Sequence, residues 1–272
     1  MTIGDSTLDD TTIDAIADHV LHAQTTATAI HKLTIDHPTM TVADGYRVQN
    51  ALRGKYLAAG HRLVGWKAGL TSKAKMQQMG VDKPGVGFLT DRMAVAEGAK
   101  VNIGELVHPK VECEVAFVLD RDLPTHGCTV DDVVAATAFV VPAIEIIDSR
   151  YEDFKFDLQS VLADNSSSSR FVLGSRGTRL SAIDRRTLGL AMVKNGDLIA
   201  TGASAAVMGD PAAAVAVVAN IVGSLGAQVQ AGHVVLSGGI TEAYAVVAGD
   251  HVSVRFQSIG TVDVGFVDPA AG

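Results

Sequence analysis

Residues 111–120 read VECEVAFVLD, a mostly apolar stretch in the first half of the chain. Two glutamates, Glu112 and Glu114, lie two positions apart inside an otherwise apolar run. Side chains at positions i and i+2 of a β-strand point to the same face, so the two carboxylates share a face. Residues 116–119 are apolar on both faces, which is typical of a strand that is covered on both sides. The sequence therefore predicts a buried strand over 110–120 that carries two neighbouring carboxylates.

Such a pair of carboxylates has two interpretations. In a half-exposed strand, the glutamate face would be the solvated one. In a buried strand, the two groups repel each other and lose hydration, so they need a cation, a shared proton or water. Glu112 and Glu114 alone leave both interpretations open.

A third carboxylate, Glu145, lies in the apolar segment VVPAIEIIDSR at 140–150. A lone glutamate there is costly to bury, and an ion pair with an arginine or lysine would satisfy it. Three carboxylates in two buried strands, without a histidine or cysteine partner near in sequence, also form a hard oxygen donor set. Such a set suits Mg²⁺ or Mn²⁺ better than zinc, and it would leave coordination positions for water or substrate.

Three other segments carry polar groups or glycines in apolar surroundings. Lys67 in VGWKAGL (64–70) either extends its ammonium group to the surface or, if it is buried, acts as a general acid or base. The segment ADNSSSSR (163–170) combines an Asp, an Asn and four hydroxyls, and it is compatible with a capped turn. The segment LSGGIT (236–241) contains two glycines, which permit a tight turn or a close approach of the backbone to a ligand.

Composition excludes several classes of protein. The 272-residue chain is 47% hydrophobic and carries a net charge of −8, which argues against non-specific binding to nucleic acid or to an anionic membrane. Two cysteines without zinc-type spacing suit a reducing cytosol, and the acidic, polar start MTIGDSTLDD is unlike a signal peptide. No apolar run of about 18 residues is free of charge or proline, so we expect a cytoplasmic protein without a membrane span. Nucleotide-binding loops and nucleophile elbows are also missing from the sequence.

Periodicity and turn signals divide the chain into a helical part and a β-rich part. Helices are predicted over 8–31, 41–59, 71–80, 129–140 and 211–226. Strands are predicted over 63–69, 110–120 and 141–147, in a 192–202 hairpin with an Asn195-Gly196 turn, and in three segments after residue 232. Residues 81–100 read as loop. The fold class is α+β, with a small helical N-terminal part (1–62) and a mixed, largely antiparallel body (63–267).

Four segments together resemble a known group of enzymes. GWKAGLTSKAKMQQMGV (65–81), HPKVECEVAFVL (108–119), PAIEIIDSR (142–150) and ADNSSSSRFVLG (163–174) are similar to segments of 2-keto-4-pentenoate hydratases and 4-oxalocrotonate decarboxylases, in the fumarylacetoacetate hydrolase superfamily. The resemblance covers about residues 40–267. It implies one catalytic domain over 1–272, built as a β-roll or sandwich with flanking helices.

The same resemblance implies roles for individual residues. Glu112, Glu114 and Glu145 would bind one Mg²⁺ or Mn²⁺, which the 1-carboxylate and 2-keto oxygens of a 2-keto acid substrate would chelate. Lys67 matches the active-site lysine of the group. The remaining matches are expected to contact substrate: Leu70 through its backbone, Ser167, Ser237 and Gly238.

Two details favour the decarboxylases of the group over the hydratases. Gly85 in KPGVG (83–87) lies where hydratases typically carry an Asp, and SGGIT (237–241) resembles the decarboxylases. The expected reaction is metal-dependent decarboxylation of 2-oxo-3-hexenedioate, a 2-keto dicarboxylate, to 2-hydroxypenta-2,4-dienoate in aromatic meta-cleavage catabolism. A hydratase, or a non-catalytic partner subunit of a related hydratase, remains an alternative. Hydrolysis of a carbon–carbon bond lacks a matching His-Glu pair. The Gly/Ala-rich strands and the apolar helix over 211–226 fit a homo-oligomer, and the resemblance implies a complex with a related hydratase.

Overall fold

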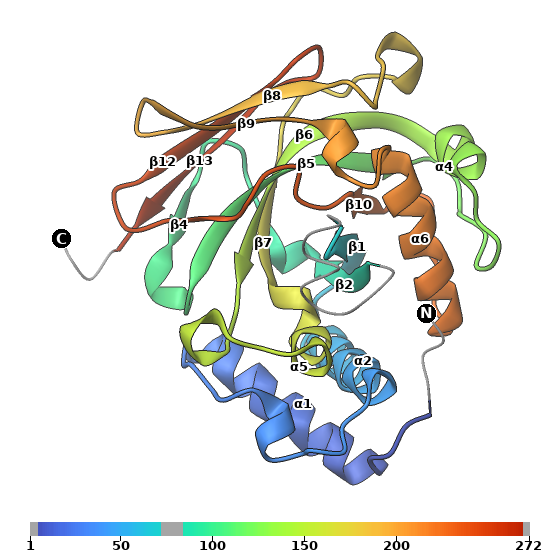
Figure 1. The fold of residues 1–272 in the computed structure, drawn as a ribbon, viewed down its shortest axis with the longest axis vertical. Coiled ribbons are helices and arrows are strands. Elements are labelled where there is room, and N and C mark those ends of the chain that lie inside the picture. Colours follow the sequence, from blue (N-terminus) through green and yellow to red (C-terminus); the bar gives the residue numbers. More distant parts are fainter. Residues whose placement is uncertain (1–4, 72–83, 269–272) are drawn as a thin grey trace.

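The computed structural model describes residues 5–71 and 84–268. The N-terminal part contains two helices, α1 (Asp10–Thr25) and α2 (Val42–Ala58). In Figure 1 they pack side by side with the short helix α5 (Leu158–Ala163). α2 begins with the predicted capping box between Thr41 and Asp44. α1 ends before the predicted residue 31, because Ala27 adopts a left-handed φ of 48°. The predicted helix over 71–80 lies outside the described residues, apart from Thr71.

The larger sheet contains the predicted strand around Glu112 at its centre. Its described strands run in the order β2 (Gly85–Thr90), β1 (Leu63–Gly69), β10 (Val234–Leu236), β5 (Pro109–Leu119), β6 (Thr137–Asp148), β7 (Ser168–Leu173) and β3 (Ala94–Val95). A further strand, β11 (Tyr244–Ala245), pairs with the start of β5. The pairs β1–β10 and β3–β7 are parallel and the other pairs are antiparallel, as predicted for a mixed sheet.

The smaller sheet runs in the order β4 (Lys100–Asn102), β13 (Gly260–Val267), β12 (His251–Phe256), β8 (Gly189–Lys194) and β9 (Asp197–Ala203). The predicted hairpin is confirmed, with φ of 57° at Asn195 and 94° at Gly196, as a type I′ turn requires. Strands β12 and β13 contact β6, so the two sheets share a layer of buried side chains. β6 is therefore both a strand of the larger sheet and part of the contact between the two sheets.

Two further helices lie at the other end of the larger sheet, α4 (Val130–Ala136) and α6 (Pro211–Ser224). α6 packs against α4, β1 and β2, and Asp210 caps its start ahead of Pro211 (Figure 1). The segment Ser204–Ser224 has the length and hydropathy of a membrane-spanning helix, but 61% of it is buried inside the protein. Burial on this scale is typical of a core helix. The short 3₁₀ helices are η1 (Leu33–Ile35), η2 (Asp91–Met93), η3 (Ile103–Glu105), η4 (Glu152–Phe154), η5 (Asn165–Ser167), η6 (Leu180–Ala182) and η7 (Ser204–Ala206).

Two predictions about secondary structure were wrong. The segment 81–100, predicted as loop, contains β2, β3 and the start of β4. The glycines of this segment lower its strand propensity, so β2 was not predicted. They permit close packing, since a Cβ at Gly87 would lie 2.7 Å from the carbonyl oxygen of Asn165. The helix predicted over 129–140 ends at Ala136, and β6 begins at Thr137. The residues that follow are rich in Val and Phe, which favour strand.

Candidate active site

The three predicted glutamates meet on one face of the β5–β6 pair. Glu112 lies directly opposite Glu145 in the register of the two strands, and Glu114 follows on the same face of β5. One carboxylate oxygen of each residue lies within 4.8 Å of the others. Oxygen ligands on opposite sides of Mg²⁺ would lie about 4.2 Å apart, so the cluster has the dimensions of a site for a single cation. The exposed fractions are 5% for Glu112 and 0% for Glu114 and Glu145, so the solvated-face interpretation is wrong.

Burial makes ionisation of Glu114 and Glu145 unfavourable. Burial raises the pKa of Glu114 well above its usual range, and repulsion from Glu145 and Glu112 raises it further. Burial also raises the pKa of Glu145, although the ammonium group of Lys67 opposes this shift. Within the described part of the chain, Glu114 Oε1 and Glu145 Oε1 have no hydrogen-bond partner. Buried carboxylate oxygens in this arrangement fit Mg²⁺ or Mn²⁺.

Lys67 extends toward the glutamates from the neighbouring part of the sheet. It lies on β1, in register with Leu236 of β10 and Gly87 of β2. Its Nζ is 3.1 Å from Glu145 Oε2, and the residue is only 3% exposed, so it does not extend to the surface. The ion pair predicted as one alternative for Glu145 is therefore present. One ammonium group offsets only part of the charge of three carboxylates, so the ion pair and a metal site are compatible.

Two glycines bring the segment after β10 against the cluster. The backbone N–H of Gly238 donates to Glu114 Oε2 over 2.6 Å, and its φ of 103° is in the range that favours glycine. A Cβ at Gly239 would lie 2.8 Å from the carboxyl carbon of Glu112. Ser237 is buried, and its hydroxyl has no partner among the described residues. Gly239 forms the cavity wall here, whereas Ser237 and Gly238 lie behind it, next to the glutamates.

The serine-rich segment carries an unusual backbone. Asn165, Ser166 and Ser167 have consecutive left-handed φ values of 49°, 52° and 58°. The Asn165 side chain accepts from the N–H of Phe88 and donates to its carbonyl oxygen, and Ser166 donates to the carbonyl oxygen of Val86. These bonds leave Ser167 as the hydroxyl that lines the cavity without a partner in the described structure. Strained backbone of this kind clusters at functional sites.

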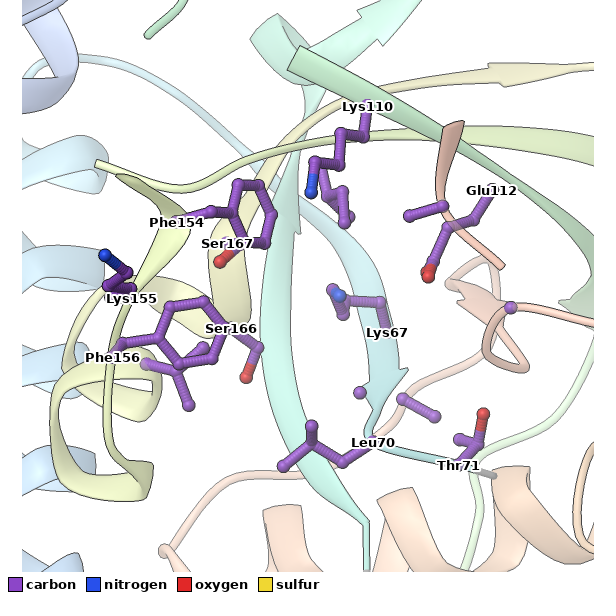
Figure 2. Close-up of a pocket in the computed structure, with 16 residues that line it drawn as sticks. Lys67, Leu70, Thr71, Lys110, Glu112, Phe154, Lys155, Phe156, Ser166 and Ser167 are labelled. Atoms are coloured by element: carbon purple, nitrogen blue, oxygen red, sulfur yellow. The ribbon is translucent and has the colours of Figure 1, made fainter. Parts of the chain in front are cut away.

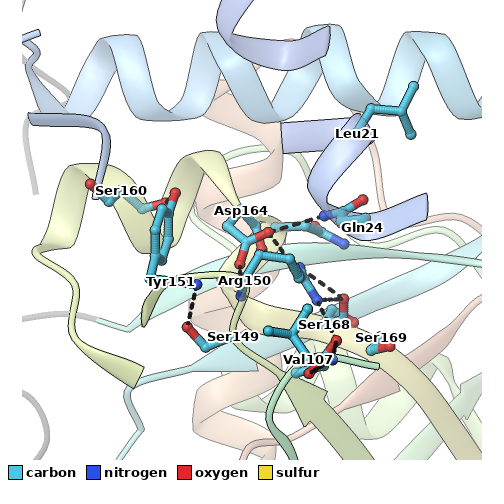
Figure 3. A network of polar contacts seen from close by, with 12 residues as sticks. Leu21, Gln24, Val107, Ser149, Arg150, Tyr151, Ser160, Asp164, Ser168 and Ser169 are labelled. Atoms are coloured by element: carbon cyan, nitrogen blue, oxygen red, sulfur yellow. Dashed lines mark hydrogen bonds and ion pairs between the residues drawn. The ribbon is translucent and has the colours of Figure 1, made fainter. Parts of the chain in front are cut away.

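A buried ion pair that was not predicted, between Arg150 and Asp164, supports this segment (Figure 3). Arg150 Nε donates to Asp164 Oδ1 over 2.6 Å, and the same guanidinium donates to the carbonyl oxygens of Asp164 and Ser168. Gln24 from α1 also donates to Asp164. Burial raises the pKa of Asp164 to about 6, although Arg150 opposes this shift. Arg150 thus fixes the backbone on both sides of Ser166 and Ser167.

The described residues line a cavity of about 480 Å³, which Glu112 reaches from β5 (Figure 2). Glu114 and Glu145 are not among its described lining residues and lie buried beside Glu112. The predicted residues Lys67, Leu70, Glu112 and Ser167 line the cavity. Leu70 has a left-handed φ of 59° at the end of β1. The lining that was not predicted is Ala68, Gly69, Thr71, Lys110, Ile147, Phe154, Lys155, Phe156, Val161, Ser166, Gly239 and Ala243. The strand period could have identified Lys110, which lies two residues before Glu112. Nothing in the sequence indicated that Phe154 and Phe156 would reach the same cavity.

Comparisons with known proteins identify relatives of this chain. Residues 64–267 match the family described as fumarylacetoacetate hydrolase, C-terminal. The chain is 47% identical to a 4-oxalocrotonate decarboxylase of Pseudomonas putida, over 93% of this chain and 96% of that protein. It is 39% identical to a 2-hydroxypent-2,4-dienoate hydratase of P. putida, over 80% of this chain and 99% of that one. The structure of 4-oxalocrotonate decarboxylase from P. putida G7 with magnesium and adipate superposes with a TM-score of 0.95 at 45% identity, covering 97% of this chain and 100% of that one.

Proposed function

This chain belongs to the fumarylacetoacetate hydrolase family, and from that premise we propose that it decarboxylates 2-oxo-3-hexenedioate to 2-hydroxypenta-2,4-dienoate and CO₂. The observation that carries the proposal is the buried cluster of Glu112, Glu114 and Glu145 with Lys67 beside it, because Glu112 and Lys67 also line a cavity. The likeness to a decarboxylase along nearly its whole length supports the choice of reaction.

Decarboxylation requires an electron sink, which is the 2-keto oxygen of the substrate. When the C5–C6 bond breaks, C6 leaves as CO₂ and the electron pair of the bond forms the C4=C5 double bond. The former C3=C4 pair shifts to C2=C3, and the keto oxygen at C2 takes up a pair as an enolate. A proton then gives the 2-hydroxydienoate. A bound Mg²⁺ or Mn²⁺ supplies Lewis-acid stabilisation of the charge that develops on this oxygen.

The protein's own residues hold and surround the reacting groups. The three glutamates would bind the metal. The ammonium group of Lys67, buried beside Glu145, would provide a proton or positive charge near the enolate oxygen. The Ser167 hydroxyl and the backbone at Leu70 line the cavity, where they would contact substrate. Ser237 and Gly238 would act from behind, since Gly238 orients the carboxylate of Glu114.

The lining of the cavity supports decarboxylation over hydration. Addition of water to a diene needs a group that handles water and protons, and Glu112 is the one carboxylate among the described lining residues. Gly85 is buried at the start of β2, and a Cβ there would lie 2.9 Å from Leu162 Cδ2, so this position offers no acid. The described lining also contains no histidine, which argues against hydrolysis of a carbon–carbon bond.

A direct assay separates the candidate reactions. Purified protein is mixed with 2-oxo-3-hexenedioate and Mg²⁺, with and without EDTA, and CO₂ and dienol absorbance are followed together. We expect CO₂ and dienol to form at equal rates, and only with metal present. In a parallel reaction supplied with 2-hydroxypenta-2,4-dienoate instead, consumption of the dienoate by a protein that releases no CO₂ from 2-oxo-3-hexenedioate would identify a hydratase. Absence of both activities would favour a non-catalytic partner subunit.

The assembly, location and physiological role extend this proposal. We propose a cytoplasmic homo-oligomer that acts in aromatic meta-cleavage catabolism and associates with a related hydratase. Two free, buried cysteines and exposed apolar side chains such as Leu198 and Val247 support a reducing compartment and subunit contacts. The dienol product matches the substrate in the name of the hydratase relative, which supports a partner that consumes it. Light scattering of the protein, alone and with that hydratase, tests both associations.

A further inference from the structure

Lys110 lies on the same face of β5 as Glu112 and Glu114, and the proposed reaction gives it no role. It lies two residues before Glu112 on β5, so both side chains point into the cavity (Figure 2). Two residues of an antiparallel strand advance about 7 Å, which is close to the length of an extended six-carbon dicarboxylate. Lys110 is flanked by Ile147 of β6 and Ala245 of β11. The backbone of Lys110 therefore lies about one ligand length from that of Glu112 along β5.

The ammonium group of Lys110 is held in place without being neutralised. Its Nζ lies 3.7 Å from the ring centroid of Phe154. Phe154 in turn packs against Phe156, with ring centroids 5.7 Å apart, and against His108, with centroids 6.4 Å apart. A cation–π contact orients a cation but leaves its full charge available to an anion.

The other two cations of the described lining are already paired. Lys67 forms its ion pair with Glu145 at the metal cluster. Lys155 is paired with Asp153 over 3.1 Å, and its side chain is 79% exposed. No carboxylate lies within ion-pair distance of Lys110 among the residues that the structure describes. Lys110 is therefore the lining cation that best fits a carboxylate delivered by a ligand.

We propose that Lys110 binds the carboxylate of the substrate that lies far from the metal, and so selects dicarboxylates over monocarboxylates. This inference rests on the proposed function for the identity of the substrate. The metal cluster holds the 2-keto acid end, and the Lys110–Phe154 pair holds the other end in the same cavity.

The fate of that carboxylate defines what Lys110 contributes to the reaction. The carboxylate leaves as neutral CO₂, so its attraction to the ammonium group weakens as the C5–C6 bond breaks. An interaction of this kind stabilises bound substrate more than the transition state. Its removal should raise KM and leave kcat unchanged or higher.

Binding of unreactive acids tests the inference without turnover. Adipate and hexanoate have equal chain lengths but two and one carboxylates, and each is titrated calorimetrically into the Mg²⁺-loaded protein. Lys110→Met should weaken adipate binding at least tenfold and leave hexanoate binding within twofold, whereas Lys110→Arg should retain most of the preference. Lys155→Met removes the same charge from the neighbouring wall, and it should change neither affinity.

Three results would overturn the inference. They are equal weakening of both acids by Lys110→Met, an equal loss of adipate binding in Lys155→Met, and a wild-type protein that binds the two acids equally. The wild-type preference for adipate should also fall as salt rises, which provides a test that needs no variant. Failure of the proposed reaction is read separately, because it appears as absence of CO₂ release by the wild type while adipate selectivity persists.

Discussion

At the scale of single residues, a substitution of Glu112 tests the chemistry of the site without disrupting the fold. Glu112→Gln keeps the shape of the side chain, so we expect the fold to survive with an unchanged circular dichroism spectrum. The same change removes an anionic metal ligand, so Mg²⁺-dependent CO₂ release should fall at least a hundredfold. Glu242→Gln, an exposed carboxylate on the segment after Gly239, is the matched control. Full activity of Glu112→Gln would contradict the metal site.

A substitution of Lys67, in contrast, is expected to lower the stability of the fold. Lys67→Met leaves buried Glu145 without its cation, and loss of one partner of a buried pair costs about 3–5 kcal/mol. We expect this loss in urea unfolding of the metal-free protein, and a smaller loss at saturating Mg²⁺, because the metal replaces the missing positive charge. Lys67→Arg should recover part of the stability. Equal destabilisation with and without Mg²⁺ would show that Lys67 and the metal do not share the cluster.

Sequence reasoning found the site residues that strand geometry and burial cost determine. Glu112 and Glu114 follow from the two-residue period, and Glu145 and Lys67 from the cost of isolated charge in apolar strands. Phe154 could not be found this way. It reaches the cavity because η4 folds back beside β5, and no local pattern encodes a contact between residues so far apart in sequence.

At the scale of elements, the start of α2 makes stability depend on pH. Burial of Asp44 opposes ionisation, but hydrogen bonds from Ser6, Thr41 and Leu8 outweigh it and hold the pKa of Asp44 well below its usual range. The unfolded chain therefore takes up a proton first as pH falls, so this stability is present above the ordinary carboxyl pKa of 3.8 and is lost below it.

Asp44→Asn should remove that stability. We expect it to cost about 1–2 kcal/mol at pH 7, with a gap to the wild type that narrows below about pH 4. Melting temperatures at pH 7 and pH 3 provide the measurement, and exposed Asp36→Asn is the control. A gap of equal size at both pH values would assign the effect to shape rather than charge.

Elements with strong local signals were predicted well, and elements that depend on distant partners were not. The Thr41–Asp44 capping box and the Asn195-Gly196 turn each act within a few residues, so α2 and the β8–β9 hairpin were found. β2 contains Gly85 and Gly87, which lower strand propensity locally. The sequence could not reveal that the backbone of Asn165 occupies the space where a side chain of residue 87 would lie.

At the scale of the whole molecule, one continuous set of buried side chains joins the helical N-terminal part to both sheets. It extends from Ile13 on α1 to Phe266 on β13. We propose that residues 1–62 and 63–267 form a single catalytic domain over 1–272. Hydrogen bonds tie the N-terminal helices to β2 and to the segment around α5, from Gln24 to Asp164 and from Gln49 to Val86 and Leu162, and they support this proposal.

Metal removal should therefore stop turnover without unfolding the chain. The ammonium group of Lys67 and the raised pKa of Glu114 relieve the charge of the metal-free cluster, and the large core remains intact. EDTA should abolish CO₂ release, leave the circular dichroism spectrum unchanged and lower the melting temperature, with full recovery in Mg²⁺. Loss of secondary structure on chelation would show that the metal is required for the fold itself.

Because Glu112 and Glu145 lie directly opposite each other, metal binding depends on the register in which β5 and β6 pair. These residues face each other only in one alignment of β5 with β6, and a slip of one residue would turn one of them to the opposite side of the sheet. A misaligned chain would then lack a complete ligand set. Metal binding therefore stabilises only those molecules in which the two longest strands, β5 and β6, have paired in the native register.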